Sequence, residues 1–374
     1  MKFICTRENF SHALDVVGGV VGKQANLPIL SHVCIVAADA KVEFIGTNLE
    51  VAIRASVRAK VDSAGSFTVP AKTLADFVHL LMDEQVEVEL KENELHIRSG
   101  NSYTKIKGVP ADEFPVIPDV EETHGYVLLV NPFRDALSKV ISSAARNDIR
   151  PELAGVYVGF FTDRFQGLLL AATDSYRLAE KKISVSQGTD EVRCIVPART
   201  VSEMIRILTV LHGEEGESQV RLSVSQNQIA LRYNTVEMTS RLIDGTYPDY
   251  AQIIPETFKT SVVVPKDILI NKIKAASLFT TSGVNAVSLA VNAGEKTLGI
   301  SSVSTQTGEH SSTIDADVTG VDGTILLNHR YILDGLQHID TDEVEFSMNG
   351  SDAPCLFKPK GDDHYLYIVM PVRQ

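Results

Sequence analysis

The sequence predicts an α+β fold made of three copies of one domain. Three stretches of its 374 residues are similar: each is a short β-rich run, a break, a basic residue and an amphipathic helical segment. The stretches are residues 67–81, 194–208 and 324–336. Their basic residues, Lys72, Arg199 and Arg330, are 127 and 131 residues apart. A spacing this long indicates repeated domains, because solenoid repeats span roughly 20 to 50 residues.

Each repeat is itself two copies of a strand, a helix and three further strands. In the first repeat, a strand over residues 1–5 precedes a helix over 7–17, and a strand over 67–70 precedes a helix over 72–82. In the second repeat, we expect the first helix over 132–146. Strict alternation of apolar and polar residues, as in 86–90, predicts half-buried strands. The chain therefore has six half-repeats, and we expect six helices in equivalent places.

Turn-rich joints near residues 119–125 and 255–260 separate the repeats. We therefore expect three domains, at residues 1–121, 126–255 and 257–374.

Composition favours a folded cytoplasmic protein. With 44% hydrophobic and 22% charged residues, each repeat can bury a core. Four cysteines (Cys5, Cys34, Cys194 and Cys355) lie far apart without metal-ligand spacing, so we expect reduced thiols and no metal site. The first eight residues include charges, unlike a signal peptide, and no run of 18 apolar residues occurs.

Charge is segregated by type of element. The six helical windows hold 11 basic and 7 acidic residues, a net charge of +4, whereas the whole chain carries −13. The other elements therefore carry −17. Two interpretations remain open: the helices line one positive surface, or their charges only solvate an exposed face.

Nothing in the sequence assembles a catalytic site or a phosphate-binding loop. Asp174, Tyr176 and His310 supply acid–base groups, but nothing orders them as nucleophile, base and orienting group. The stretch 16–20 lacks the Gly-x-Gly-x-x-Gly spacing, so no cofactor is expected. Two function classes stay open at this point: an enzyme on a repeated α+β scaffold, and a peptide-binding adaptor.

Five short motifs, in this order and spacing, make the whole chain resemble the bacterial DNA polymerase III β subunit family, the sliding clamps. These motifs are Leu27–Leu30, Gly46–Glu50, Thr173–Leu178, Tyr247–Tyr250 and Val369–Arg373. The resemblance implies a non-catalytic processivity factor. Two subunits would join head to tail into a six-domain ring around duplex DNA, with helices inside and sheets outside.

The resemblance also explains the segregated charge, because lysines and arginines on the inner helices would contact phosphates without reading sequence. The DNA-binding residues that it implies are Lys72, Arg134, Lys139, Arg199, Arg206, Lys266 and Arg330. For the seam between subunits it implies Tyr103 and Ile106 on one side, and Leu278 and Phe279 on the other.

A further implied feature is a surface pocket for short peptides carried by the replicative polymerase, the clamp loader, other polymerases and repair proteins. Its residues would be Arg150, Leu153, Thr173, Ser175, Tyr176, Arg177, Leu178, Pro248, Ile253, Asn328, Tyr331, Ile368, Met370, Pro371, Val372 and Arg373.

We expect the peptide to have a Gln-like head and a Leu/Phe tail, the tail contacting Leu178, Pro248, Ile253 and Met370. Two residues depart from the family pattern: Ser175 replaces a common glycine, and Gln374 ends the chain where an apolar residue is frequent.

Overall fold

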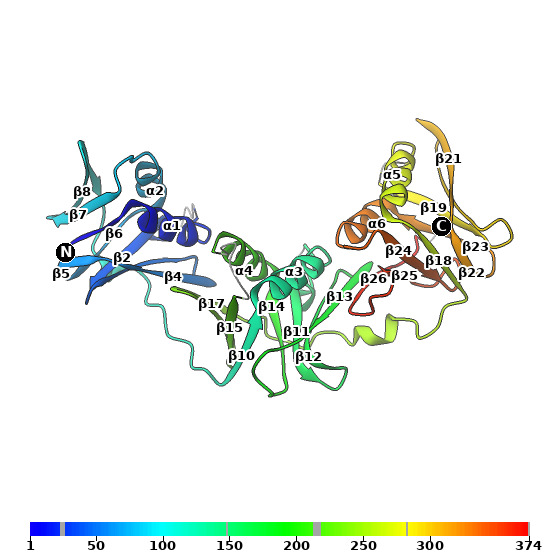
Figure 1. Cartoon of the computed structure of the whole chain (residues 1–374), viewed down its shortest axis with the longest axis horizontal. Helices are drawn as coiled ribbons and strands as arrows, with labels where there is room; N and C mark the ends of the chain where they lie inside the picture. Colours follow the sequence, from blue (N-terminus) through cyan, green and yellow to red (C-terminus); the bar gives the residue numbers. More distant parts are fainter. Residues whose placement is uncertain (23–26, 147–148, 212–217, 282, 373–374) are drawn as a thin grey trace. The chain divides into compact units, whose positions relative to one another are not determined.

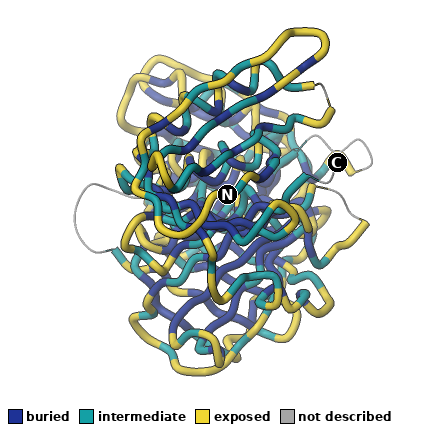
Figure 2. Tube along the Cα trace, turned by 90° about the vertical axis from the view of Figure 1, so that its right-hand side faces the viewer, coloured by how far each residue is buried: buried dark blue, intermediate teal, exposed yellow. Residues whose placement is uncertain are grey.

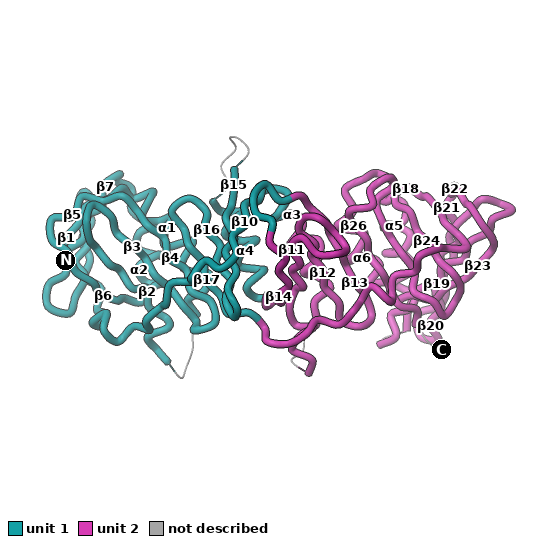
Figure 3. The backbone as a smooth tube through the Cα atoms, turned by 90° about the horizontal axis from the view of Figure 1, so that it is seen from below, with its two compact units in different colours: residues 1–134, 185–189, 199–242 teal, residues 135–184, 190–198, 243–374 magenta. Residues whose placement is uncertain are grey.

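The computed structural model describes residues 1–22, 27–146, 149–211, 218–281 and 283–372. These residues form six α-helices, four short 3-10 helices and 26 strands (Figure 1). They belong to two compact units (Figure 3). Unit 1 comprises residues 1–134, 185–189 and 199–242; unit 2 comprises residues 135–184, 190–198 and 243–374.

Unit 1 contains the first repeat and part of the second. Its elements are β1 (Lys2–Thr6), α1 (Arg7–Gly18), η1 (Pro28–Ser31), β2 (His32–Ala38), β3 (Lys41–Thr47), β4 (Val51–Arg58), β5 (Lys60–Ser63), β6 (Gly65–Pro70), α2 (Ala71–His79), β7 (Gln85–Lys91), β8 (Glu94–Ser99), β9 (Ser102–Lys107), η2 (Ala111–Glu113), β10 (His124–Leu129), β15 (Gln219–Val224), β16 (Gln228–Tyr233) and β17 (Val236–Arg241). Two helices have residues in both units: α3 (Val130–Ile141) and α4 (Ala198–Val210).

Two sheets organise unit 1. One has the order β5-β1-β7-β8-β9, and the other has the order β10-β15-β16-β17-β4-β3-β2-β6. The second sheet is continuous across two repeats because β17 pairs antiparallel with β4. Helices α1 and α2 contact each other, and α1 also packs on β3 and β4.

Unit 2 contains the rest of the second repeat and the third. Its elements are η3 (Pro151–Leu153), β11 (Gly155–Thr162), β12 (Phe165–Thr173), β13 (Arg177–Ile183), β14 (Val192–Pro197), η4 (Tyr250–Ile253), β18 (Thr260–Pro265), α5 (Lys266–Ser277), β19 (Ala286–Asn292), β20 (Thr297–Ser304), β21 (Gly308–Asp315), β22 (Asp317–Gly320), β23 (Gly323–Asn328), α6 (His329–Leu336), β24 (Glu343–Met348), β25 (Cys355–Pro359) and β26 (Tyr365–Val369).

The sheets of unit 2 repeat the arrangement of unit 1. One sheet runs β14-β11-β12-β13-β26-β25-β24-β18-β22, and the other runs β21-β20-β19-β23. Again a strand of the second repeat, β13, pairs antiparallel with a strand of the third, β26. Helices α5 and α6 contact each other. Because strands pair across the repeats, the two compact units do not follow the three repeats.

The helices begin where the sequence breaks the preceding strands. Helices α2 and α5 start directly after Pro70 and Pro265, each at the end of a strand. Thr6 caps α1 by accepting a hydrogen bond from the amide of Asn9 at 3.3 Å, and Asn328 caps α6 by accepting one from Arg330. A side-chain acceptor at this position satisfies an amide that the helix leaves unpaired.

The predicted fold class and the six predicted helices are confirmed. The strands alternate buried and more exposed residues, as β7 and β19 do, and buried segments are interspersed with exposed ones along the chain in Figure 2. The ends of two helices differ from the prediction. Helix α2 ends at His79 instead of residue 82, and α3 covers 130–141 instead of 132–146.

Candidate functional site

The site begins with a tight loop between β12 and β13. The hydroxyl of Thr173 donates to the carbonyl of Arg177 at 2.6 Å and accepts from the amide of Ser175 at 3.1 Å. The carboxylate of Asp174 accepts from the amides of Tyr176 and Arg177, both at 3.0 Å. These bonds hold Ser175 at a φ of 75°. Glycine adopts such a backbone conformation at lower cost than serine does.

Arg177 joins this loop to helix α6. Its side chain is 5% exposed and contacts Asp174 at 3.0 Å and Asp334 at 2.5 Å. Its guanidinium also lies 4.7 Å from the ring centroid of Tyr331. Burial alone would lower the pKa of Arg177, but Tyr367 and Asp334 more than offset this and raise it. The loop and the helix are therefore held by a buried, charge-assisted network.

A cavity of about 640 Å³ opens beside this network. The exposed ring of Tyr176 stacks on Tyr331, with 6.5 Å between the ring centroids. Seven residues predicted from the sequence line the cavity: Arg150, Leu153, Ser175, Tyr176, Arg177, Asn328 and Tyr331. An open, partly apolar cavity of this size with charged groups in its wall can hold a short peptide segment.

Sequence reasoning missed several lining residues. Arg146, Ile149, Asp174, Asn285 and Asp334 line the cavity, and so does Arg330, which was assigned to DNA. Asp174 was set aside as part of a weak acid–base set, and here it anchors the loop instead. For Asp334, its position three residues after Tyr331, one helical turn onward, was the available signal.

The C-terminal segment lies against the same loop. Strand β26 pairs with β13, and beyond it the amide of Met370 donates to the carbonyl of Tyr176 at 2.9 Å. The amide of Val372 donates to the carbonyl of Leu326 at 2.8 Å. The structure thus brings 173–178 and 368–372 together, including Pro371 between the two bonds. Arg373 lies outside the described residues.

Four predicted pocket residues contribute to the interior and do not line this cavity. Leu178 and Ile368 are fully buried in one apolar cluster, and Ile253 packs against it. Thr173 is 6% exposed and holds the loop through its hydroxyl. The expected direct contact of a peptide tail with Leu178 therefore does not fit the structure as it stands, because core side chains cover it.

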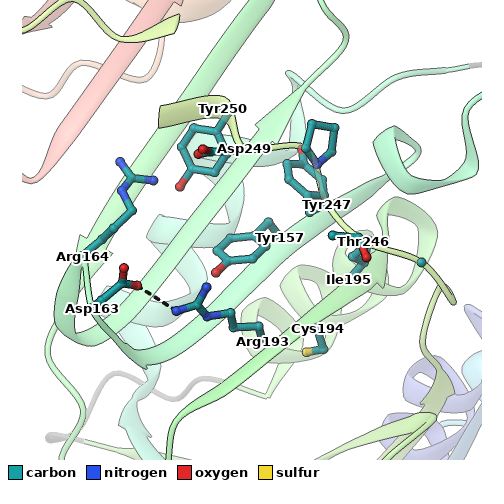
Figure 4. Close-up of a pocket in the computed structure, with 12 residues that line it drawn as sticks. Tyr157, Asp163, Arg164, Arg193, Cys194, Ile195, Thr246, Tyr247, Asp249 and Tyr250 are labelled. Carbon is teal, nitrogen blue, oxygen red and sulfur yellow. Dashed lines mark hydrogen bonds and ion pairs between the residues drawn. The ribbon is translucent and has the colours of Figure 1, made fainter. Parts of the chain in front are cut away.

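Pro248 lines a second cavity of about 470 Å³. Tyr157, Tyr247 and Tyr250 surround it, and Arg193 pairs with Asp163 at its edge, at 2.7 Å (Figure 4). The phenol oxygen of Tyr247 accepts from the amide of Thr173 at 3.0 Å.

The phenol of Tyr250 also holds the segment 247–250, which follows β17. Tyr250 donates to the buried carboxylate of Glu180 at 2.7 Å. Together with the bond to Tyr247, this contact fastens residues 247–250 to β12 and β13.

Several of the basic residues assigned to DNA have intramolecular partners. Lys139 is 5% exposed and bonds to both Asp135 and Asp340. Burial alone would lower its pKa, but the hydrogen bonds to these carboxylates raise it. Its ammonium therefore does not face solvent, and we do not retain it as a phosphate contact.

Arg206 and Lys266 likewise donate to backbone carbonyls. Arg206 bonds to Asp15 and Val16 at the end of α1, and Lys266 bonds to Ile339. Lys72 and Arg199 are exposed, and Arg134 is partly buried. Lys72 pairs with Asp76, one helical turn along α2, at 2.9 Å, which is a weak exposed interaction.

The predicted seam residues differ in exposure. In unit 1, Tyr103 is 48% exposed, whereas Ile106 is 6% exposed and faces the sheet interior. In unit 2, Leu278 is 72% exposed and Phe279 is partly buried against His310, with the rings stacked at 5.9 Å. Ile106 is therefore part of the core of its sheet, and Tyr103 is the side chain available for a contact.

Three consecutive profiles of one family match the chain. These describe the DNA polymerase III beta subunit N-terminal domain over residues 1–118, the central domain over 128–249 and the C-terminal domain over 251–373. The chain belongs to the DNA polymerase III beta subunit family. Members of this family are non-catalytic processivity factors, the sliding clamps.

Curated and solved relatives agree with this assignment. The chain is 27% identical to a beta sliding clamp of Staphylococcus aureus, covering 100% of this chain and 99% of that protein. It matches the DNA polymerase sliding clamp of Bacillus subtilis with a TM-score of 0.93 at 27% identity, covering 100% and 99% of the two chains. The beta subunit of Thermotoga maritima matches with a TM-score of 0.91 at 28% identity and the same coverage.

Of the helices in the described ranges, none is long and apolar enough to cross a membrane. All four cysteines carry free thiols, and burial raises the pKa of Cys5 to about 12 and that of Cys34 to about 11. Buried thiols of this kind are poor nucleophiles.

We expect Asp334→Asn to destabilise the protein by about 1–3 kcal/mol, because it leaves the buried guanidinium of Arg177 with one carboxylate fewer. The matched variant Asp76→Asn removes the exposed partner of Lys72 and should cost less than about 0.5 kcal/mol. Urea denaturation followed by circular dichroism measures both changes. Equal losses of stability in the two variants would contradict the role given to the Arg177 network.

Proposed function

We propose that this chain closes with a second copy into a six-domain ring that encircles duplex DNA and tethers polymerases to it. The observation that carries the proposal is the ordered match of three beta-subunit domains along almost the whole chain. We place the domains at residues 1–121, 126–255 and 257–374. The ring would act in the cytoplasm and needs no cofactor.

Retention of such a ring on DNA is topological, so the protein need not bind DNA tightly. Its helices would supply a mild positive surface whose contacts to phosphates carry no sequence information. Lys72 and Arg199, exposed on α2 and α4, are the best candidates because they extend into solvent. Arg330 is the second residue of α6, as Lys72 and Arg199 are of their helices, and Arg134 lies further along α3.

Substitution of Lys72→Glu together with Arg199→Glu should reduce loading onto circular DNA and lower the salt slope of association by about 0.9 per lost contact. The control Lys60→Glu with Lys360→Glu changes the net charge equally, at exposed positions outside the helices. Retention on nicked circular DNA, and release after linearisation, are measured by gel filtration. Wild-type protein that leaves circular and linear DNA equally fast would refute the ring.

Two strands at sheet edges support a head-to-tail dimer. Strand β9 is an edge of the sheet in unit 1, and β21 is an edge of the four-stranded sheet in unit 2. Unpaired edges are prone to pair with another chain. The two edges have complementary charge, since β9 carries Lys105 and Lys107 and β21 carries Glu309 and Asp315. Tyr103 and Leu278 add exposed apolar area beside these edges.

We expect Tyr103→Ala combined with Leu278→Ala to shift the dimer towards monomer at low concentration, because burial of each side chain is worth roughly 1.5–3 kcal/mol. Analytical ultracentrifugation over a dilution series measures the shift. A control pair, Val116→Ala with Val321→Ala, trims residues that are exposed elsewhere on the two units. An unchanged dissociation constant in the first pair would reject this seam.

The cavity beside Arg177 is our proposed site for partner peptides. Its wall combines aromatic rings, an aliphatic surface and arginines, which suits a short segment with polar and apolar residues. Met370, Pro371 and Val372 extend along its loop through the backbone bond to Tyr176. The replicative polymerase, the clamp loader and repair proteins would share this one site in turn.

Deletion of 370–374, or Tyr176→Ala, should weaken binding of a pentapeptide that starts with Gln and ends in Leu-Phe. We expect a dissociation constant near micromolar, about −8 kcal/mol, for the unmodified protein. Isothermal titration measures the loss, and Tyr103→Ala, an exposed tyrosine in unit 1, serves as the control. Full-strength binding to the truncated protein would place the peptide site elsewhere.

A further inference from the structure

The repeat builds the same backbone frame twice, once in each unit. In unit 2, β13 pairs with β26 from Arg177↔Val369 to Lys181↔Tyr365. In unit 1, β4 pairs with β17 from Val51↔Ser240 to Ala55↔Val236. Both are antiparallel ladders of five residue pairs, and each joins strands from consecutive repeats.

The loops that enter these strands are equivalent bond for bond. The hydroxyl of Thr47 donates to the carbonyl of Val51 at 2.9 Å and accepts from the amide of Leu49 at 3.0 Å. The side-chain oxygen of Asn48 accepts from the amides of Glu50 and Val51. Thr173, Asp174 and Ser175 make the same bonds in unit 2. Leu49 has a φ of 77°, beside 75° at Ser175.

The segments that follow β17 and β26 are equivalent as well. The amide of Arg241 donates to the carbonyl of Glu50 at 3.2 Å, as that of Met370 donates to Tyr176 at 2.9 Å. Pro115 precedes the first joint as Pro248 precedes the second. The guanidinium of Arg54 holds the first joint in place, bonding to Asp119 and to the carbonyl of Ile117, each at 2.6 Å.

In unit 1 this frame surrounds an open cavity of about 340 Å³. Its lining includes Leu49 and Val116, which are 48% and 94% exposed, together with Pro115 and Pro118. A bulky residue such as leucine at positive φ is a strained exception, and strain of this kind concentrates at binding sites. Here it holds an apolar side chain at the rim of a groove.

The groove also carries an available cation. Arg241 lines the cavity and is exposed, and its guanidinium forms no ion pair with any residue the structure describes. Glu50 is the other charged lining residue. A carboxylate on a ligand could therefore form an ion pair with Arg241, in the same groove as the apolar side chains of Leu49 and Val116.

We propose that this groove of unit 1 is a second peptide-binding site, for an extended segment with an apolar side chain and an adjacent carboxylate. The apolar side chain contacts Leu49 and Val116, and the carboxylate pairs with Arg241. The peptide class rests on the function proposed for the cavity of unit 2, because equivalent loop residues, Ser175–Arg177 and Leu49–Val51, line the two cavities. A partner with two such segments would engage both sites and gain from avidity.

The probe is an acetylated pentapeptide with Gln first, Asp in the middle and Leu-Phe last, titrated into the full-length protein by calorimetry. We expect two sites per chain, the weaker of which is lost or about tenfold weaker in Leu49→Gly. Glycine suits the positive φ of residue 49, so this variant removes the apolar wall without straining the loop. Arg241→Gln should weaken the same site, whereas the control Arg58→Gln, at an exposed arginine of unit 1 outside the groove, should leave it unchanged.

Location and independence are checked with the deletion of 370–374 and a photo-crosslinking version of the probe. In the truncated protein, the remaining binding should crosslink to 49 or 116 and disappear with Leu49→Gly. If the probe crosslinks to 49 or 116 in the truncated protein but never to 176 or 331 in the full-length protein, the proposed unit 2 site is wrong. The present inference would then still hold. A single site per chain, unaffected by Leu49→Gly, would overturn it.

Discussion

Antiparallel strand pairing across the repeat boundaries is the constraint on which the rest of the structure depends. Backbone groups at a strand edge must be paired or solvated. The ladders β4–β17 and β13–β26 satisfy two such edges and turn strands of separate repeats into continuous sheets. Each ladder also holds a loop against a second segment of the chain: the loop before β4 contacts the end of β17, and the loop before β13 contacts the segment after β26. The cavities beside Leu49 and beside Arg177 follow from this arrangement.

Much of the fold could be predicted because its signals are local. Alternating residues predicted the strands, and a break after a β-rich run predicted the start of a helix. The end of α2 was missed because Leu80 and Met82 continue an apolar pattern, although they are 79% and 96% exposed. After His79 the amides of Leu80 and Leu81 form turn bonds to Phe77 and Val78. Apolar content alone does not reveal such a turn.

The candidate site was predictable as a meeting of segments but not residue by residue. Neighbouring residues in a strand point to opposite faces, so Arg177 lines the cavity while Leu178 enters the core. The resemblance implied that Arg177 and Leu178 both line the pocket. Lys139 shows a different limit: Asp340, 201 positions along the chain, neutralises it. Only the folded chain brings that carboxylate to a lysine that looked available for DNA.

The β4–β17 and β13–β26 ladders have the same backbone bonds in their loops but different side chains. The guanidinium of Arg177 can be buried because Asp174 and Asp334 neutralise its charge. These two ion pairs connect the loop of unit 2 to α6. In unit 1 the equivalent residues are Val51 and Asn48, and the loop is held by its own turn bonds and by the ladder. Without a buried guanidinium, that groove needs no carboxylate from a helix. The shared ladder therefore sets where a groove forms, and the side chains on it set which ligand it suits.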